Sequence, residues 1–353
     1  MEHTPNGILL VDKAEGWTSH DVVAKARRAL GTRKVGHAGT LDPMATGLLL
    51  LGAGPATRLL THLVGLDKTY LTTIRLGYST VTDDREGETA RVAEPGHIAE
   101  LARHPVWLHE AVAALTGDIK QKPSAVSAIK VDGRRAYDRV RAGEQVELTK
   151  RPVTIHEFSI GEPRMLTIRD EDGHEIDVLE IDATVRCSSG TYVRALARDL
   201  GAALDVGGHL TALRRTAVGP FTVDQAASNE ALADGGIGRE ALLTPTDVAA
   251  RLFPVLRLTP QQEIDLGHGK RLDLPHGQCE NTPLAAAIAE DGRLVGLVKV
   301  ERGRTRVVTN FPPATIEVPE TPETPAIPQA SEAPRAPEST DASTTAEASE
   351  TSA

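Results

Sequence analysis

The sequence GHAGTLDPMATG, residues 36–47, places a single acid, Asp42, among small and turn-forming residues. Its three glycines allow backbone conformations and close approaches that other residues forbid. The apolar run LLLL at 48–51 predicts a buried strand that anchors the loop. Such a loop either holds a carboxylate rigidly toward a cleft or forms an ordinary Asp-Pro turn, in which Asp42 bonds to its own backbone. The loop alone leaves both interpretations open.

Strand and helix patterns surround this loop without a regular strand–helix–strand alternation. Residues 8–11 have the pattern of a short buried strand. Ser19 is a suitable N-cap for a helix over 21–30, which Gly31 ends. Further along the chain the patterns predict a helix over 56–64, strands over 69–76 and 180–186, a Ser-Ser-Gly turn at 188–190 and a helix over 192–204. This mixture favours an α+β fold over a doubly wound sheet.

The length of 353 residues and the apolar content of 40% indicate two or three domains with a sizeable core. The two cysteines, Cys187 and Cys279, form no C-x-x-C motif, which fits a reducing compartment. We find neither a signal-peptide pattern nor an apolar run of the roughly 18 residues that a membrane span needs. We therefore expect a cytoplasmic protein without a membrane partner.

The net charge of −10 is unevenly distributed along the chain. Residues 312–353 hold eight acids and one arginine, a net charge of −7, which leaves −3 for residues 1–311. Basic residues cluster within that body, for example at 33–34, 134–135 and 214–215. A phosphate-binding surface needs local positive charge rather than a positive total, although any one cluster can equally be a solvated face.

The C-terminal part of the sequence has a different character. A boundary is expected near residues 245–254, and short strands over 284–288, 294–300 and 304–308 then predict a small β-rich module that ends near Phe311. The remaining residues are rich in Pro, Glu, Thr, Ala and Ser and have almost no large apolar side chains. Such a composition cannot bury enough surface to offset its ordering entropy, so we expect a disordered acidic tail.

Two further stretches hold candidate functional residues. Tyr70 lies at the start of a predicted strand; where only 3% of residues are aromatic, it is either half-buried core or a surface on which a base stacks. Arg194 lies in the first turn of a predicted helix, where the helix dipole disfavours a cation by about 0.3–1 kcal/mol. An anion should compensate, either Asp42 or an RNA phosphate. The alternative is an exposed arginine whose stem lies on Tyr192.

No sequence pattern indicates a cofactor or a metal. The stretch GAGPAT at 52–57 follows a predicted strand but lacks the third glycine of a dinucleotide-binding loop. The histidines form no H-E-x-x-H motif, and the histidines and cysteines have no metal-binding spacing.

Taken together, these stretches closely resemble the TruB family of tRNA pseudouridine synthases, from about Gly7 to Phe311. The matching sequences are GILLVDKAEGWTS at 7–19, GHAGTLDPMATG at 36–47, DKTYLTTIRLG at 67–77, QKPSAVSAIKVDGRRAY at 121–137, CSSGTYVRALARDLG at 187–201 and HLTALRRTAVGPF at 209–221. The chain departs from the family's usual residues at Ala14, Ala38, Ser124 and Val126. None of these positions holds a candidate site residue.

The resemblance implies conversion of uridine 55 in the TΨC loop of tRNA to pseudouridine, without a cofactor or metal. The N1–C1′ glycosidic bond breaks, the uracil turns, and C5 is joined to C1′. By resemblance, Asp42 is the catalytic aspartate and Arg194 pairs with it and keeps it ionised. Tyr70 stacks on the target uracil and assists loss of its C5 proton. The family leaves open whether the aspartate attacks the uracil ring or C1′.

Other residues are implied to bind the RNA, whose target base must be flipped out of its loop. His37 fills the space that the flipped uridine leaves, Tyr192 supports the site, and Leu213 lines the pocket. The residues implied to hold phosphates are Lys68, Arg134, Arg135, Arg214 and Arg215.

The implied architecture is a pseudouridine synthase fold, with a mixed, largely antiparallel central sheet flanked by helices. The catalytic domain covers 1–248 and includes a loop at about 121–150 that closes over the RNA. A module at 249–311, similar to a PUA domain, contacts the acceptor end of the tRNA, and the tail covers 312–353. We expect a monomer with tRNA as its partner and no obligate protein partner.

Two other functions are compatible with parts of the sequence. A non-catalytic factor that binds or folds tRNA would retain the site for its shape, but the presence of Asp42, Tyr70 and Arg194 argues against that as the sole role. A hydrolase acting on a small nucleoside would not need the C-terminal module or the basic segments. A tRNA-refolding activity is compatible with the synthase as well.

Overall fold

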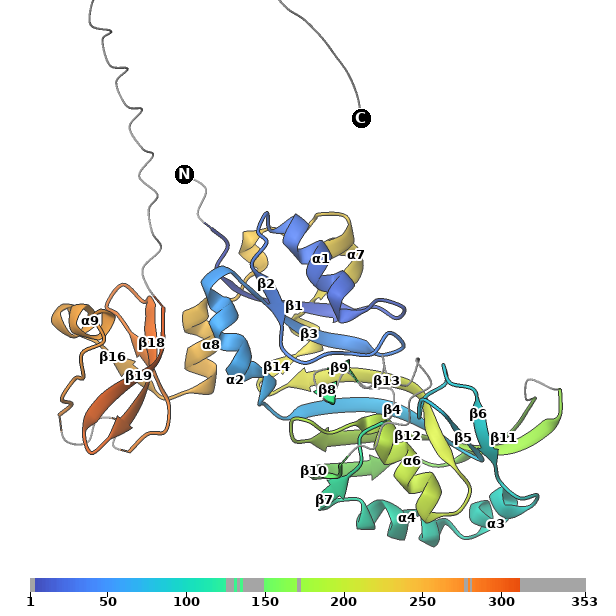
Figure 1. Ribbon diagram of the computed structural model, residues 1–353. Coiled ribbons are helices and arrows are strands. Elements are labelled where there is room, and N and C mark those ends of the chain that lie inside the picture. Colours follow the sequence, from blue (N-terminus) through green and yellow to red (C-terminus); the bar gives the residue numbers. More distant parts are fainter. Residues whose placement is uncertain are drawn as a thin grey trace, which may run out of the picture. The chain divides into compact units, whose positions relative to one another are not determined.

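The computed structural model describes residues 4–124, 130–131, 134–135, 149–169, 173–275, 279 and 281–311 (Figure 1). These described residues belong to one compact unit. Most of the loop expected at 121–150 and all of the tail expected at 312–353 lie outside the described residues.

The fold is built on a mixed sheet that runs through the centre of this unit (Figure 1). Its strand order is β15-β1-β3-β13-β4-β12-β10-β7, with β2, β11 and β14 paired at its sides. Among the described strands, β15 pairs with β1 and β13 with β3 in parallel, and the remaining pairings of this sheet are antiparallel. The predicted α+β fold with a largely antiparallel sheet is therefore confirmed.

The strands of the central sheet have these bounds: β1 Gly7–Lys13, β2 Val35–His37, β3 Thr46–Ala53, β4 Lys68–Leu76, β7 Gly117–Gln121, β10 Arg151–Ile160, β11 Arg164–Arg169, β12 Glu175–Cys187, β13 Gly208–Val218, β14 Phe221–Thr222 and β15 Ala227–Ser228. Two short hairpins accompany it, formed by β5 (Tyr78–Thr80) with β6 (Thr89–Val92) and by β8 (Lys130–Val131) with β9 (Arg134–Arg135).

Strands β1 and β3 are buried on both faces, which explains why their sequences are continuous apolar runs rather than alternating ones. Leu49 and Leu51 pack in one core cluster with residues of helix α1 (Ser19–Ala29). Leu48 and Leu50 point the other way, into a second cluster that also contains Ile288 and Leu297 of the C-terminal strands. The loop that carries Asp42 is thus anchored to a buried strand, as predicted.

The loop that carries Asp42 joins β3 at the point where β3 pairs with β13. The two strands pair over only two positions, Thr46 with Arg214 and Gly47 with Arg215. Gly47 has φ +99°, and a Cβ atom there would lie 2.3 Å from the carbonyl oxygen of Arg215. A side chain at Gly47 would therefore push the start of β3 away from β13, so this glycine is required by close packing.

Helix α1 begins at Ser19 itself, which is one residue earlier than if Ser19 were its N-cap. Thr18 is the N-cap: its Oγ1 accepts the N–H of Asp21 at 3.1 Å, and its own N–H donates to the Asp21 carboxylate at 2.9 Å. The prediction of Ser19 as the cap is therefore wrong, because the reciprocal pair with Asp21 favours Thr18. Ser19 is already inside the helix, and Gly31 follows the helix end with φ +64° as predicted.

The other helices lie along the sheet (Figure 1). The segment predicted as one helix over 56–64 is a 3-10 turn, η1, that begins at Gly54-Pro55 and continues as a short α-helix. Helix α6 begins one residue after the predicted start and packs on β13 and β4. The bounds are η1 Gly54–Leu59, α2 Leu60–Val64, α3 His97–Arg103, α4 Pro105–Ala114, α6 Val193–Ala203, η2 Val223–Gln225, α7 Asn229–Ala233, η3 Arg239–Ala241 and α8 Pro245–Leu252.

The C-terminal part forms a separate four-stranded sheet in the order β16-β17-β18-β19. The predicted strands are confirmed as β17 (Ala285–Ile288), β18 (Leu294–Glu301) and β19 (Arg304–Asn310). Strand β16 (Val255–Arg257) and helix α9 (Pro260–Gly267) complete this part, which has its own apolar cluster. No helix in the described part of the chain is both long and apolar enough to span a membrane.

Candidate active site

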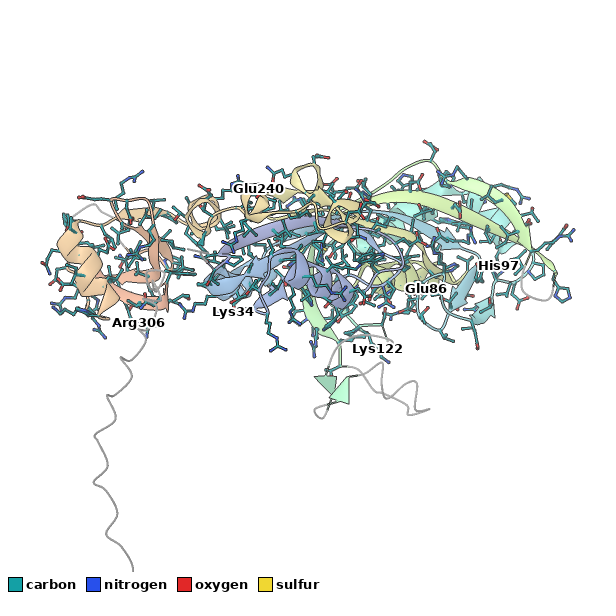
Figure 2. All side chains as sticks on the ribbon, turned by 90° about the horizontal axis from the view of Figure 1, so that it is seen from above. Lys34, Glu86, His97, Lys122, Glu240 and Arg306 are labelled. Carbon is teal, nitrogen blue, oxygen red and sulfur yellow. The ribbon has the colours of Figure 1, made fainter. Side chains whose placement is uncertain are left out.

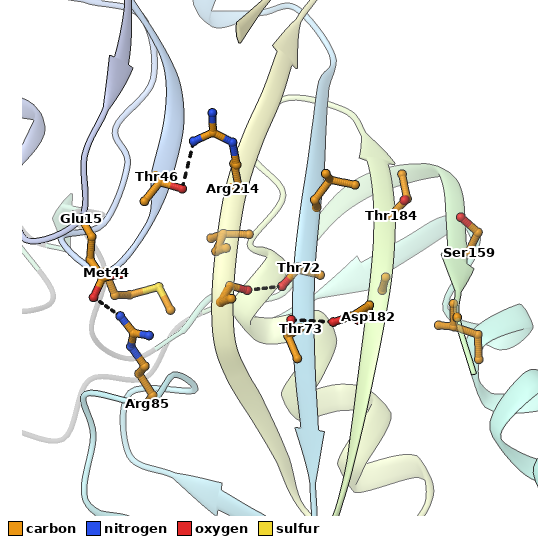
Figure 3. Close-up of a pocket in the computed structure, with 16 residues that line it drawn as sticks. Glu15, Met44, Thr46, Thr72, Thr73, Arg85, Ser159, Asp182, Thr184 and Arg214 are labelled. Carbon is orange, nitrogen blue, oxygen red and sulfur yellow. Dashed lines mark hydrogen bonds and ion pairs between the residues drawn. The ribbon is translucent and has the colours of Figure 1, made fainter. Parts of the chain in front are cut away.

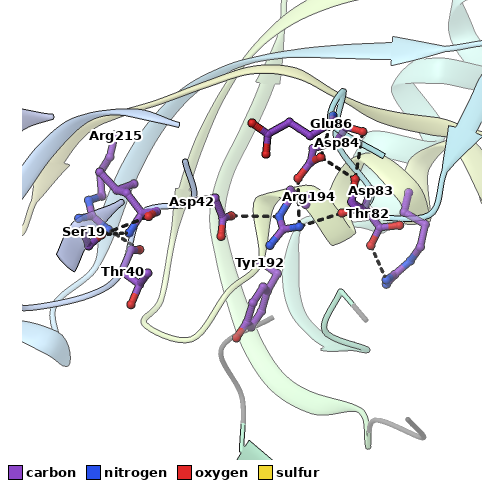
Figure 4. Close-up of polar contacts among 12 residues, drawn as sticks. Ser19, Thr40, Asp42, Thr82, Asp83, Asp84, Glu86, Tyr192, Arg194 and Arg215 are labelled. Atoms are coloured by element: carbon purple, nitrogen blue, oxygen red, sulfur yellow. Dashed lines mark hydrogen bonds and ion pairs between the residues drawn. The ribbon is translucent and has the colours of Figure 1, made fainter. Parts of the chain in front are cut away.

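Asp42 and Arg194 are in direct contact although 152 positions separate them in the sequence (Figure 4). The Nε atom of Arg194 lies 3.0 Å from Oδ2 of Asp42. The Asp42 side chain is 37% exposed, whereas that of Arg194 is 5% exposed. The acid can therefore be reached from outside while its cation is enclosed. The predicted anionic partner of Arg194 is Asp42, and the interpretation of Arg194 as an exposed arginine is wrong.

Asp84 is a second carboxylate beside Arg194, which the sequence did not single out. Nη1 of Arg194 lies 3.0 Å from Oδ2 of Asp84 and donates to the carbonyl oxygen of Thr82 at 2.8 Å. Arg194 is thus tied by one nitrogen to the loop after β5 and by another to Asp42 (Figure 4). A guanidinium has donors in a fixed planar fork, so the two contacts together fix the position from which Arg194 faces Asp42.

The carboxylate of Asp42 faces a pocket of about 280 Å³. Tyr70 and Leu213 contribute side chains from β4 and β13, and Val64 lies at the end of α2. Further parts of the wall come from the loop that carries Asp42 and from the turn that leads into α6. The pocket is lined by Gly39, Thr40, Leu41, Asp42, Val64, Lys68, Tyr70, Ser188, Ser189, Gly190, Thr191, Tyr192, Val193, Arg194, Leu213 and Arg215. It therefore brings together most of the residues that the sequence predicted for the site.

Opposing effects set the protonation of Asp42. Burial in the floor of the pocket raises the pKa of the Asp42 carboxyl, and the charge of Asp84 raises it further. The Arg194 guanidinium acts in the other direction and lowers this pKa by its charge and its hydrogen bond, and Lys13 also lowers it by charge. The pKa of Asp42 lies above its ordinary value on balance, so Arg194 is the main group that favours the ionised form.

Tyr70 lies on β4 with its hydroxyl inside the protein. Burial raises the pKa of the Tyr70 hydroxyl, and the Arg215 guanidinium beside it opposes that shift. Tyr70 also belongs to the main apolar cluster. Tyr70 is therefore part of the apolar core and also part of the pocket wall, so each of the two interpretations from the sequence describes one of its surroundings.

Lys68 and Arg215 do not lie on the surface, where a phosphate contact was expected. Lys68 is buried and donates to the carbonyl oxygens of Val64 and Leu66, and burial lowers the pKa of its ammonium group to about 8. Arg215 is 1% exposed and donates to the carbonyl oxygens of Leu48 at 2.7 Å and Gly39 at 3.1 Å. Both cations bind main-chain oxygens and both line the pocket that Asp42 faces. The phosphate-binding role expected for them stays a prediction.

The remaining predicted residues lie in different surroundings. The main chain of Tyr192 exchanges hydrogen bonds with the side-chain amide of Gln121, at 2.8 and 3.0 Å. His37 ends β2 and meets His20 edge to face, with ring centroids 5.7 Å apart. The buried Nδ1 of His37 makes no hydrogen bond within the described part of the chain.

Arg214 pairs with Asp12 at 2.7 Å. The side chains of Arg134 and Arg135 lie outside the described residues.

A larger pocket of about 650 Å³ lies on the open face of the sheet (Figure 3). Leu213 lines both pockets. The charged side chains of the larger pocket are already paired: Arg85 with Glu15, Arg214 with Asp12, and Asp182 with Arg164. Thr72 and Thr73 also have partners, the Ala212 carbonyl and Asp182. The smaller pocket, with an accessible acid beside a buried cation, is therefore the better candidate for chemistry.

Three successive family models match the chain. They are the N-terminal domain of TruB family pseudouridylate synthases at residues 27–193, the C-terminal domain of tRNA pseudouridylate synthase B at 194–250, and the C-terminal region of tRNA pseudouridine synthase II at 253–312. The matches follow one another in order and together cover the candidate site.

Curated relatives match over nearly their whole length. The chain is 54% identical over 307 residues to tRNA pseudouridine synthase B of Leifsonia xyli subsp. xyli, which is 87% of this chain and 97% of the relative. It is 51% identical over 315 residues to the protein of the same name from Arthrobacter sp. strain FB24, covering 88% and 97%. A third such protein, from Thermobifida fusca, is 50% identical over 306 residues, covering 87% and 98%.

Solved structures share the fold at lower sequence identity. A chain in the structure of an H/ACA RNP bound to a substrate RNA containing 2′-deoxyuridine aligns with a TM-score of 0.60 at 23% identity, covering 89% of this chain and 87% of that one. A chain in a Cbf5-Nop10-Gar1 complex aligns with a TM-score of 0.58 at 24% identity, covering 88% and 85%.

The fold, the site and these matches define a pseudouridylate synthase. The chain belongs to the TruB family of these enzymes, as the resemblance of its sequence motifs had indicated. The prediction of an enzyme of this class is thereby confirmed.

Proposed function

We propose that this enzyme converts uridine 55 in the TΨC loop of tRNA to pseudouridine, with Asp42 as the catalytic aspartate. The observation that supports this most is the accessible Asp42 carboxylate, 3.0 Å from the enclosed Arg194, at the floor of a small pocket. The relatives named tRNA pseudouridine synthase B support tRNA as the substrate.

The reaction is an isomerisation and therefore needs no external reactant. The N1–C1′ bond of the uridine breaks, the uracil turns within the pocket, and C5 bonds to C1′. The proton on C5 is lost and N1 gains one, so the composition of the nucleotide is unchanged. Asp42 acts as a nucleophile and is released again before the reaction is complete: if it adds to C1′, C5 displaces it as the new bond forms, and if it adds to the uracil ring, it is eliminated from the ring.

The pocket suits a single flipped pyrimidine. Tyr70 and Leu213 offer a ring and an apolar side chain from neighbouring strands, between which a base can stack. Arg194 holds the negative charge of Asp42 before attack, and its enclosure strengthens that interaction. Flipping costs a few kcal/mol, and we propose that His37 offsets part of this by occupying the space that the uridine leaves.

We propose a domain division in which residues 1–248 carry the catalytic site and residues 249–311 form a PUA-like module that contacts the acceptor end. Arg306 projects from β19 of this module, opposite Lys299 of β18 in the register (Figure 2). On the catalytic part, Lys34 and Lys122 are exposed and available to phosphates (Figure 2). Action as a cytoplasmic monomer stays a prediction.

The test is to map pseudouridine at nucleotide resolution in tRNA that has been incubated with the purified enzyme. Unmodified transcripts should acquire pseudouridine at position 55, and a transcript with cytidine at that position should acquire none. Modification at another position would contradict the assignment of uridine 55. Binding of tRNA with no modification at any position would support the alternative of a non-catalytic tRNA-binding factor.

A further inference from the structure

The peptide that precedes Asp42 is held by a side chain from helix α1. The Oγ atom of Ser19 accepts the N–H of Leu41 at 2.9 Å and lies 3.1 Å from the carbonyl oxygen of Leu41, to which it donates its own proton. Ser19 is 1% exposed, and both contacts are buried. One hydroxyl thus satisfies the donor and the acceptor of the residue next to Asp42.

The rest of the loop is held in a similar way. Arg215 donates to the carbonyl oxygens of Gly39 and Leu48 on either side of this region, and Nζ of Lys13 donates to that of Pro43 at 3.2 Å. The main chain on both sides of Asp42 is therefore fixed by buried polar side chains. Ser19 differs from these two cations in being small and neutral, so its hydroxyl can be removed without leaving a charge or a large cavity.

The Ser19 hydroxyl is available for this contact because it does not take part in capping helix α1. Thr18 and Asp21 complete the N-terminal cap of α1 by themselves. Two adjacent residues therefore have separable tasks: Thr18 stabilises the helix, and Ser19 bonds to a residue 22 positions further along the chain. This separation provides a matched pair of substitutions at the same helix end.

We propose that Ser19 is a positioning residue for catalysis, whose hydroxyl fixes the Leu41 peptide so that the Asp42 carboxylate keeps its contact with Arg194. This inference rests on the function proposed above. Without the hydroxyl, the N–H of Leu41 is buried and unpaired, and the loop can shift to satisfy it. A displacement of the nucleophile by about 1 Å can slow a reaction by about 100-fold.

Such a shift also alters the charges that the Asp42 carboxylate experiences. The charged and titratable groups that act on it or respond to it come from β1, β4, α6 and the loop after β5; they are Lys13, Tyr70, Arg194, Asp84 and Glu86. Arg194 is the largest of the influences that lower the pKa of Asp42. Loosening the Asp42–Arg194 contact therefore raises this pKa, and the rate should begin to fall at a higher pH as the solution is acidified.

The test compares Ser19→Ala with Thr18→Ala in the full-length enzyme, at a temperature where circular dichroism shows both to be folded. Three quantities are measured: the single-turnover rate of pseudouridine formation, the Kd for tRNA, and the pH at which the rate is half-maximal on the acidic side. For Ser19→Ala we expect a rate about 10- to 100-fold lower, a Kd within about threefold of the unsubstituted enzyme, and a half-maximal point at higher pH. Thr18→Ala should lower the thermal midpoint and leave all three quantities unchanged.

A third variant separates the hydroxyl from its packing. Ser19→Cys nearly preserves the side-chain volume but replaces the hydroxyl with a weak hydrogen-bonding group. It should show the same shift of the acidic limb as Ser19→Ala. The proposal is overturned if Ser19→Ala reacts at the unsubstituted rate, if Thr18→Ala slows the reaction equally, or if Ser19→Cys leaves the acidic limb unmoved. Failure of the proposed function is a different result, because the unsubstituted enzyme would then form no pseudouridine.

Discussion

Arg194 and Asp84 form a buried ion pair, with Nη1 3.0 Å from Oδ2 and side chains that are 5% and 4% exposed. Asp84 contacts Nη1 of Arg194 and Asp42 contacts its Nε, and the two carboxylates lie on different sides of the guanidinium (Figure 4). Asp84 therefore stabilises the cation in the orientation that leaves its Nε for Asp42. Charged groups enclosed in this way interact more strongly than exposed ones, and losing one partner has a large cost.

Replacing Arg194 with lysine keeps the charge but removes the planar fork of donors. A single ammonium group cannot reproduce the contacts to Asp42, Asp84 and Thr82 together. We expect Arg194→Lys to lower the single-turnover rate by at least about 100-fold and the free energy of unfolding by about 1–3 kcal/mol. Quenched-flow kinetics and urea titration would measure the two effects. A lysine variant with near-normal turnover would show that charge alone is sufficient.

Replacing Asp84 with asparagine tests the electrostatic account by the direction of a pH shift. The charge of Asp84 raises the pKa of Asp42, so its removal should lower that pKa. Arg194 is still held by the Thr82 carbonyl and by Asp42 itself. Because the proposed mechanism needs ionised Asp42, the acidic limb of the rate profile should move to lower pH in Asp84→Asn.

Asp83→Asn is the matched control for this shift. Asp83 is adjacent in the sequence and is also buried, but its ion pair is with Arg198, at 3.1 Å, rather than with Arg194. Its neutralisation should leave the acidic limb in place. The proposed influence of Asp84 would be contradicted if the acidic limb of the rate profile did not move in Asp84→Asn, or if it moved equally in both variants.

The adjacent arginines 214 and 215 should differ sharply in their effect on stability. Arg215 is buried and donates to several main-chain carbonyls, so Arg215→Met should lower the free energy of unfolding by at least about 3 kcal/mol. The side chain of Arg214 is 40% exposed and pairs with Asp12, a contact worth at most about 1 kcal/mol. Urea denaturation of Arg214→Met and Arg215→Met compares them. If both variants lost the same free energy of unfolding, the burial of Arg215 would not explain its contribution to stability.

Much of the fold could be predicted because local patterns and tertiary structure agree. The apolar run that forms β3 is buried on both faces, and the alternating residues of β12 place Ile181, Ala183 and Val185 inside. Arg194 could be assigned an anionic partner because a cation at a helix start needs one. These inferences depend on residues close in the sequence or on a general electrostatic rule.

The remaining features depend on contacts that no local pattern specifies. Asp84 meets Arg194 from 110 positions away, and nothing in its own segment marks it as part of the site. Lys68 and Arg215 have the sequence character of surface residues, yet the sheet brings main-chain carbonyls to both of them. Thr18 and Ser19 are both suitable caps for α1, and only the position of Leu41 shows why Ser19 is used elsewhere.

The most direct test of the central claim is the yield of pseudouridine at position 55 with Asp42→Asn. The amide cannot act as the nucleophile, but it nearly preserves the shape of the carboxylate beside Arg194. We predict no detectable pseudouridine at enzyme excess over several hours, with a Kd for tRNA within about threefold of the unsubstituted enzyme. Pseudouridine formed by Asp42→Asn at a rate near that of the unsubstituted enzyme would contradict the account.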